Sequence, residues 1–102
     1  MPKLRARAVR WASDEPIPGW VEVEFVDADG LPRVLEDKPP TFGGPDLAPD
    51  TAYPVDVLVA CETLGPAGDD GRVLISTERP WGTTTAAGLS EFVVLEEQLV
   101  RD

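Results

Sequence analysis

The stretch Trp20-Val21-Glu22-Val23-Glu24-Phe25-Val26 decides the fold class. Its apolar residues alternate with glutamates, which is the period-two pattern of a β-strand with one buried face and one solvated face. Asp27-Ala28-Asp29-Gly30 follows as a turn in which Gly30 can take a positive φ. Residues 33–37 return as the partner strand, so this region predicts a β-hairpin. We expect Trp20, at the start of the strand, to lie in the core or to plug one end of the fold.

The segment before this hairpin, residues 4–11, is also predicted to be a strand. One face carries Leu4, Ala6 and Ala8, and the other face passes from two arginines to Val9 and Trp11. The first ten residues hold four of the nine basic residues and no acid. Such a strand could bind an anionic partner, but Glu22 and Glu24 offer cross-strand charge pairs. We therefore expect the basic residues to be paired within the protein.

Three further strands are predicted after the hairpin, at residues 55–63, 72–77 and 91–95. The first of them is apolar on both faces, which favours a central or doubly covered position. Eleven prolines and nine glycines leave little room for long helices. About six strands with regularly spaced turns predict one all-β domain over residues 1–102, namely a small antiparallel barrel, with a sandwich as the alternative. The tail after residue 95 is left open between strand, helix and disorder.

Composition excludes several classes of function. Nineteen acidic and nine basic residues give a net charge of −10, which repels phosphate backbones, so we expect no nucleic-acid partner. There is no histidine, the commonest general base and metal ligand.

The single cysteine, Cys61, allows no intrachain disulfide and predicts a cytoplasmic protein with an inert core thiol. No apolar run approaches the ~18 residues of a membrane-spanning helix, so no membrane partner is predicted. The chain lacks asparagine and has two lysines, a bias typical of a GC-rich bacterial genome.

The patterns that suggest catalysis or metal binding are weak. Asp27-Ala28-Asp29-Gly30 resembles the start of a calcium loop, but Lys38 stands where the twelfth-position glutamate belongs, and a hairpin turn explains it better. Glu22 and Glu24 would lie about 7 Å apart on one strand face, a spacing that acid/base pairs and ordinary solvated sheets share. We predict no enzyme, no catalytic residue, no metal site and no cofactor, with a carboxylate-dependent hydrolase as the weakest alternative.

Two loops carry the candidate contact residues. Residues 38–54 form the longest irregular stretch, and their apolar members Phe42, Leu47 and Tyr53 predict that it packs on the body; whether it is also functional stays open. The second loop is Arg79-Pro80-Trp81-Gly82. An exposed tryptophan beside an arginine has the chemistry of an interface hot spot, although the indole could instead fold back as a cap. The candidate partner-binding residues are therefore Arg79, Trp81 and Phe42.

The order of these segments resembles a known family. The strand 21–25, the turn to Gly30, the segment 37–42, the strand 55–59 and the closing segment 88–94 resemble the C-terminal β-barrel domain of the elongation factor Tu family. The resemblance is one of pattern, and the loop 79–82 has no counterpart in it. It implies a closed six-stranded barrel used for protein or RNA contacts, and it carries over no functional residue.

The sequence thus predicts a non-enzymatic protein-interaction module. Because the chain is acidic, a protein is a better partner than RNA. The alternative is an acidic immunity-type or inhibitor-type protein that neutralises a basic partner by charge complementarity. A small-ligand binder and a homo-oligomer stay open.

Overall fold

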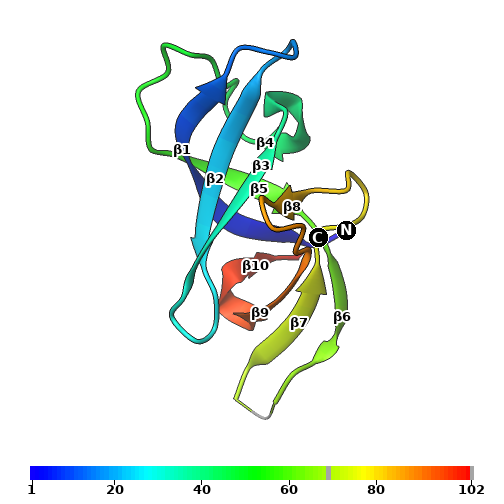
Figure 1. The fold of residues 1–102 in the computed structure, drawn as a ribbon. Helices are drawn as coiled ribbons and strands as arrows, with labels where there is room; N and C mark the ends of the chain where they lie inside the picture. The colour runs from blue at the N-terminus through cyan, green and yellow to red at the C-terminus, as the bar shows by residue number, and fades with distance from the viewer. Residues whose placement is uncertain (69, 102) are drawn as a thin grey trace.

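Two antiparallel sheets make up the protein in a computed structural model that describes residues 1–68 and 70–101 (Figure 1). The strands are β1 (Lys3–Ser13), β2 (Trp20–Val26), β3 (Pro32–Asp37), β4 (Phe42–Gly43), β5 (Val55–Ala60), β6 (Glu62–Pro66), β7 (Arg72–Ser76), β8 (Thr84–Thr85), β9 (Glu91–Leu95) and β10 (Leu99–Val100). The larger sheet runs β4-β5-β1-β2-β3-β8, with β10 paired to β1, and the smaller runs β6-β7-β9.

The prediction of an all-β antiparallel fold is confirmed, but the two sheets are not closed into a barrel. Among the described residues, no helical segment has the length and apolar character that a membrane-spanning helix needs.

The predicted hairpin is formed by β2 and β3. Val21, Val23 and Phe25 are buried, as the alternation predicts, and Val23 lies opposite Leu35 in the register. The expectation for Trp20 is wrong, because this residue is only half-buried and does not pack on the core cluster. Its neighbour Val21 takes the core-facing position, so the pleat directs Trp20 to the other face.

Strand β1 differs from the simple alternation because its pairing with β2 is irregular. The register shifts between Ala8 and Arg10, and again between Trp11 and Ser13. A bulge inserts a residue and reverses which face the following side chains occupy. Trp11 therefore packs against the core instead of lying on the outer face, and Arg10 points outward.

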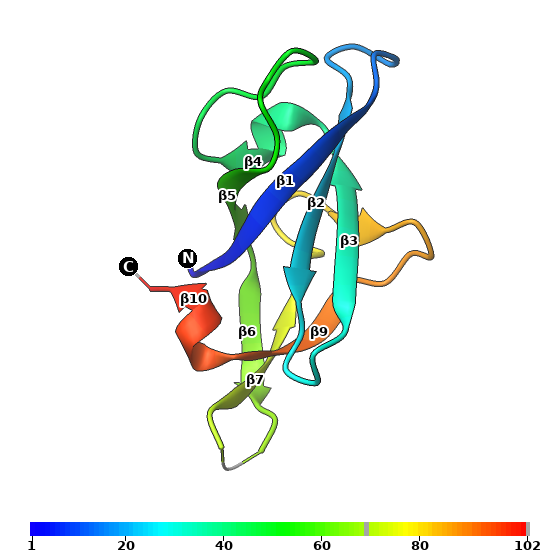
Figure 2. The same ribbon diagram turned by 90° about the vertical axis from the view of Figure 1, so that its left-hand side faces the viewer.

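The predicted strand 55–63 divides into two strands that belong to different sheets. β5 lies between β4 and β1 in the larger sheet, whereas β6 pairs with β7 in the smaller one. Figure 2 shows that β6 continues the course of β5. The break is at Cys61, which is fully buried and whose N–H donates to the carbonyl of Pro2 over 3.1 Å. The predicted strands at 72–77 and 91–95 are confirmed as β7 and β9.

The long segment 38–54 packs on the body as expected, and part of it is regular. It contains a 3-10 turn, η1 (Pro39–Thr41), followed by β4, which pairs with β5. Phe42 is buried in the core, and Leu47 and Tyr53 pack against it. The Tyr53 hydroxyl donates to the carbonyl of Ala48 over 2.7 Å, which closes the loop on itself.

The two sheets share one hydrophobic cluster. The rings of Phe25 on β2 and Phe92 on β9 meet edge to face, with their centroids 5.1 Å apart. The N–H of Ala28 donates to the carbonyl of Val93 over 2.8 Å and ties the β2–β3 turn to β9. The tail is ordered in the described residues: a second 3-10 turn, η2 (Glu96–Gln98), leads into β10, which pairs with β1.

Candidate protein-interaction surface

The loop that holds Trp81 is closed at its base by hydrogen bonds between buried threonines. The Thr77 hydroxyl donates to the carbonyl of Thr83 over 2.6 Å, and the N–H of Thr83 donates to the carbonyl of Thr77 over 3.1 Å. The Thr83 hydroxyl also donates to a carboxylate oxygen of Asp37 on β3, over 2.8 Å. Within the loop, the N–H of Gly82 donates to the carbonyl of Glu78 over 2.6 Å. The turn is therefore anchored to the larger sheet.

Trp81 projects from this anchored turn into solvent. Its exposed fraction is 61%, so the indole is not a buried cap of the fold. Figure 1 shows the loop between β7 and β8 projecting from the edge of the structure. An exposed tryptophan leaves a large apolar area in water, which costs free energy that a partner can recover by covering it.

An open groove lies on one side of Trp81 and has a volume of about 310 Å³. Its walls and floor are mainly apolar, and we call it the Trp81 groove. Leu58 and Ala60 contribute the outer face of β5, where both are half-buried. The groove is thus built by four segments far apart in the sequence: the N-terminus with Lys3, the segment with Pro40 and Gly43, β5 with Leu58 and Ala60, and the turn with Pro80 and Trp81.

Two neighbouring hollows beside the tryptophan each contain a lysine. Lys3 lines the Trp81 groove, and Lys38 lines a smaller hollow of about 150 Å³ that shares Pro40 and Trp81 with the groove. No described acidic residue lines either hollow. Farther along β5, a hollow lined by Arg5 and Asp56 shares Gly43 and Leu58 with the groove.

The basic residues of the protein fall into two groups. Four arginines have carboxylate partners: Arg10 with Glu22, Arg33 with Asp27, Arg72 with Asp29 and Asp70, and Arg101 with Glu96. The other five, which we call the free cations, are exposed, and their side chains have no hydrogen bond or ion pair among residues 1–68 and 70–101. They are Lys3, Arg5, Arg7, Lys38 and Arg79.

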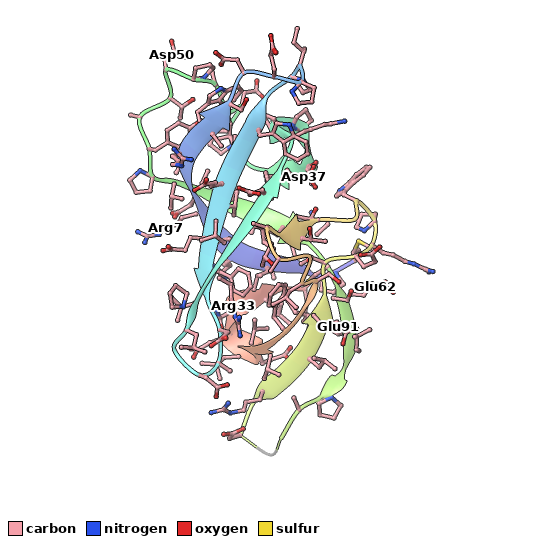
Figure 3. The ribbon with its side chains drawn as sticks, in the orientation of Figure 1. Arg7, Arg33, Asp37, Asp50, Glu62 and Glu91 are labelled. Atoms are coloured by element: carbon pink, nitrogen blue, oxygen red, sulfur yellow. The ribbon has the colours of Figure 1, made fainter. Side chains whose placement is uncertain are left out.

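The expectation of internal pairing for the basic first strand is therefore correct for one residue only. Arg10 donates to Glu22 over 2.9 Å. Arg7 lies opposite Glu24 and Asp56 in the register but makes no ion pair with either. Figure 3 shows the Arg7 side chain directed away from the body of the molecule. Register brings side chains near each other, but long solvated side chains gain little by closing such a pair.

The three predicted contact residues separate in the structure. Arg79 and Trp81 lie together in the exposed turn. Phe42 has an exposed fraction of 6% and belongs to the core cluster, so we drop it from the contact surface. Leu58 and Ala60 were missed, because apolar residues on both faces of β5 were interpreted as double burial. Their signal was present in the sequence, but only the position of the distant Trp81 loop shows what they line.

The other chemically interesting residues have structural roles. The Asp27 carboxylate accepts hydrogen bonds from the N–H groups of Asp29 and Leu31 and from the Arg33 guanidinium, at 2.9 to 3.0 Å. Burial alone would raise the pKa of Asp27, but these donors outweigh it and the pKa lies below its ordinary value. This arrangement confirms the interpretation of residues 27–30 as a hairpin turn.

The Cys61 thiol is buried in the core as expected. Burial raises its pKa to about 11, so the thiolate that reacts with oxidants and electrophiles is scarce at neutral pH. Among the described residues there is no group of three or more histidine, cysteine or acidic side chains placed to hold a metal ion. Glu22 is held by Arg10, which gives this carboxylate a structural partner.

Comparison with known proteins adds no relative: the chain matches no protein-family model, and no curated protein and no solved structure is similar to it at a significant level. The resemblance to the elongation factor barrel therefore stays a prediction.

Proposed function

We propose that this protein is a non-enzymatic interaction module that binds another protein through Trp81 and the Trp81 groove. The observation that carries the proposal is the exposed indole on a hydrogen-bonded turn beside an apolar groove. Tryptophan is among the residues that contribute most to binding energy at protein interfaces. Because the turn is anchored at its base, little conformational entropy would be lost when a partner covers the indole.

The size and composition of the groove favour a protein ligand. Its volume of about 310 Å³ is at the lower limit of pockets that enclose a small molecule, and it is open to solvent. An open apolar groove with an aromatic wall suits one or two side chains of a partner. Arg79, which is exposed in the same turn as Trp81, can add a charged contact at the rim.

The rival function is that of an immunity-type protein that neutralises a basic partner. It is favoured by the excess of nineteen acidic over nine basic residues. In that case the binding surface would be acidic, and Trp81 would lie outside it. The two functions therefore differ in whether loss of Trp81 weakens binding.

The test compares proteins retained from a lysate of the source organism by the wild-type protein and by Trp81→Ala, with affinities then measured for each purified partner. We expect Trp81→Ala to weaken the specific partner at least 30-fold, which corresponds to a hot-spot contribution of about 2 kcal/mol or more. The matched control is Ile17→Ala, since Ile17 is 88% exposed in a different loop. Retention of every partner by Trp81→Ala with unchanged affinity would overturn the proposal.

A further inference from the structure

The free cations are not spread evenly over the protein. Arg79 is exposed in the same turn as Trp81, Lys38 and Lys3 line the two hollows beside the indole, and Arg5 lines the next hollow along β5. Arg7 continues this row on the outer face of β1, one pleat from Arg5, or about 7 Å. In a chain with a net charge of −10, four of the five basic side chains without a carboxylate partner in the described structure line these neighbouring hollows, and the fifth, Arg79, belongs to the exposed Trp81 turn.

The apolar part of this face is continuous with the row of cations because of strand register. Lys3 lies opposite Ala60, and Arg5 lies opposite Leu58. Side chains that are opposite each other on neighbouring strands occupy the same face of a sheet. Each of these two cations therefore borders an apolar residue of the groove floor. No described acidic residue lines the Trp81 groove itself, and the first one along this face is Asp56, which shares a hollow with Arg5 and lies opposite Arg7 in the register.

We propose that the occupant of the Trp81 groove is an extended acidic segment of a partner protein, with one large apolar side chain seated against Trp81 and Leu58 and with carboxylates beside Lys3 and Arg5. This inference rests on the proposed function and specifies the chemistry of the partner. Unpaired cations around an apolar groove are complementary to a ligand that carries both features. They would also raise the rate of encounter with an acidic chain locally, although the protein as a whole is acidic.

Two other occupants fit the surface less well. A nucleic acid would bring a phosphate every few ångströms against a protein whose remaining surface is acidic, and Asp56 and Glu24 border the hollow that Arg5 and Arg7 line. A second copy of this chain could offer its acidic side to the cations. That contact would join two different surfaces and would not close, so it predicts open-ended association.

The first experiment selects peptides without assuming a sequence. A library of random ten-residue peptides displayed on phage is panned against the immobilised wild-type protein. We expect enrichment of sequences with at least three aspartates or glutamates around one Leu, Phe or Trp. Enrichment of basic or uncharged sequences, or no enrichment over the Trp81→Ala protein, would overturn the inference.

The second experiment measures affinities of the best selected peptide by fluorescence anisotropy. Lys3→Gln with Arg5→Gln should weaken binding about tenfold at low salt and should reduce the salt dependence. Arg101→Gln is the matched control, because it removes a cation that is already paired with Glu96 and should change the affinity less than twofold. Equal effects of the two changes would contradict a specific role for the free cations.

Gly43→Val tests the groove without removing any group. The Cβ it adds would lie 3.6 Å from the Cβ of Leu58, an ordinary contact, and Gly43 does not have a positive φ. Valine also suits a strand position, so the protein should fold. The branched side chain would occupy the groove floor, and we expect at least a tenfold loss of affinity that salt does not alter. Unchanged affinity would place the ligand elsewhere.

Two further readouts separate the alternatives. If a fluorescein-labelled single-stranded oligonucleotide of twenty bases bound more tightly than the selected peptide, the ligand would be a nucleic acid and the inference would be wrong. It would also be wrong if sedimentation showed self-association abolished by the Lys3 and Arg5 changes. Trp81→Ala could release the cellular partner while the Lys3 and Arg5 changes do not. That result would support the proposed interaction module but contradict the inference that its partner is acidic.

Discussion

Basic side chains are paired with carboxylates at the β2–β3 turn but are left unpaired, among the described residues, on the face around Trp81. At the turn, Arg33 and Arg72 donate to Asp27 and Asp29 over 3.0 and 2.7 Å. Arg33 also lies over the Phe92 ring, 6.0 Å from its centroid. Around Trp81 the free cations have no such partners among the described residues. The first region uses charge to hold the two sheets together, and the second leaves charge available to a ligand.

The contrast has a physical reason in burial. Asp27 has an exposed fraction of 8%, so its carboxylate has lost most of its contact with water. Without hydrogen-bond donors from the protein, this desolvation would destabilise the folded state. Arg5 and Arg7 stand on a solvated strand face, where water satisfies them at little cost. Pairing of the charged side chains is therefore obligatory at the β2–β3 turn and optional on the face around Trp81.

Three sets of substitutions test this difference by their effects on stability.

The largest effect is expected for Phe92→Ala at the junction of the two sheets. Phe92 has an exposed fraction of 4% and meets Phe25 edge to face. Removing the ring leaves a cavity and should lower the free energy of unfolding by about 4 kcal/mol, measured by urea denaturation. Leu89→Ala, at a half-exposed site just before β9, is the control and should change it little. A loss below about 1 kcal/mol would mean that the sheets do not depend on this contact.

A smaller decrease in the free energy of unfolding is expected for Asp27→Asn. The amide oxygen can still accept from the N–H groups of Asp29 and Leu31, but the amide NH2 cannot accept from the Arg33 guanidinium, and the negative charge is lost. The unfolding free energy should therefore fall by about 2 kcal/mol at neutral pH. Because the pKa of Asp27 is lowered on folding, its contribution is complete above the ordinary value of 3.8 and is lost as the pH falls through the folded pKa. The gap between the two proteins should therefore narrow below pH 3.8.

The control for this change is Asp50→Asn, since Asp50 is exposed in the loop 38–54 and should show neither effect. A gap between the wild type and Asp27→Asn that stays constant from neutral pH down to pH 2 would contradict the assigned role of the carboxylate.

The smallest effect on stability is expected for Arg72→Gln, measured as its difference in urea midpoint from Arg5→Gln. Both changes remove one positive charge, but only Arg72 has carboxylate partners, at 2.7 and 3.1 Å. Arg72→Gln should lower the urea midpoint slightly at low salt, and the difference should vanish near 1 M salt, where the screening length is about 3 Å. Arg5→Gln should leave the midpoint at the value expected from net charge alone. Equal midpoints for the two variants would remove the distinction between paired and free cations.

Some of the candidate surface could be predicted from the sequence. The Arg-Pro-Trp-Gly segment predicts a loop with Trp81 in it, but it leaves open whether the indole is exposed or folds back as a cap. The exposure of Trp81 is a finding of the structure. The apolar character of Phe42 predicts packing on the body, but its full burial, which removes it from the contact surface, depends on the pairing of β4 with β5. Trp11 was assigned to the wrong face because a bulge in β1 leaves no mark in the alternation.

The strand character of most of the chain, the hairpin of β2 and β3, and the acidic charge could be read from the sequence, because alternation, turn residues and composition act locally. The folded chain was needed to show that the sheets remain open, that β5 and β6 belong to different sheets, and that Lys3 and Lys38 line hollows beside Trp81. Such features depend on contacts between segments that are distant in the sequence, such as those of Lys38 and Trp81, which line the same hollow. Local periodicity carries no information about these contacts.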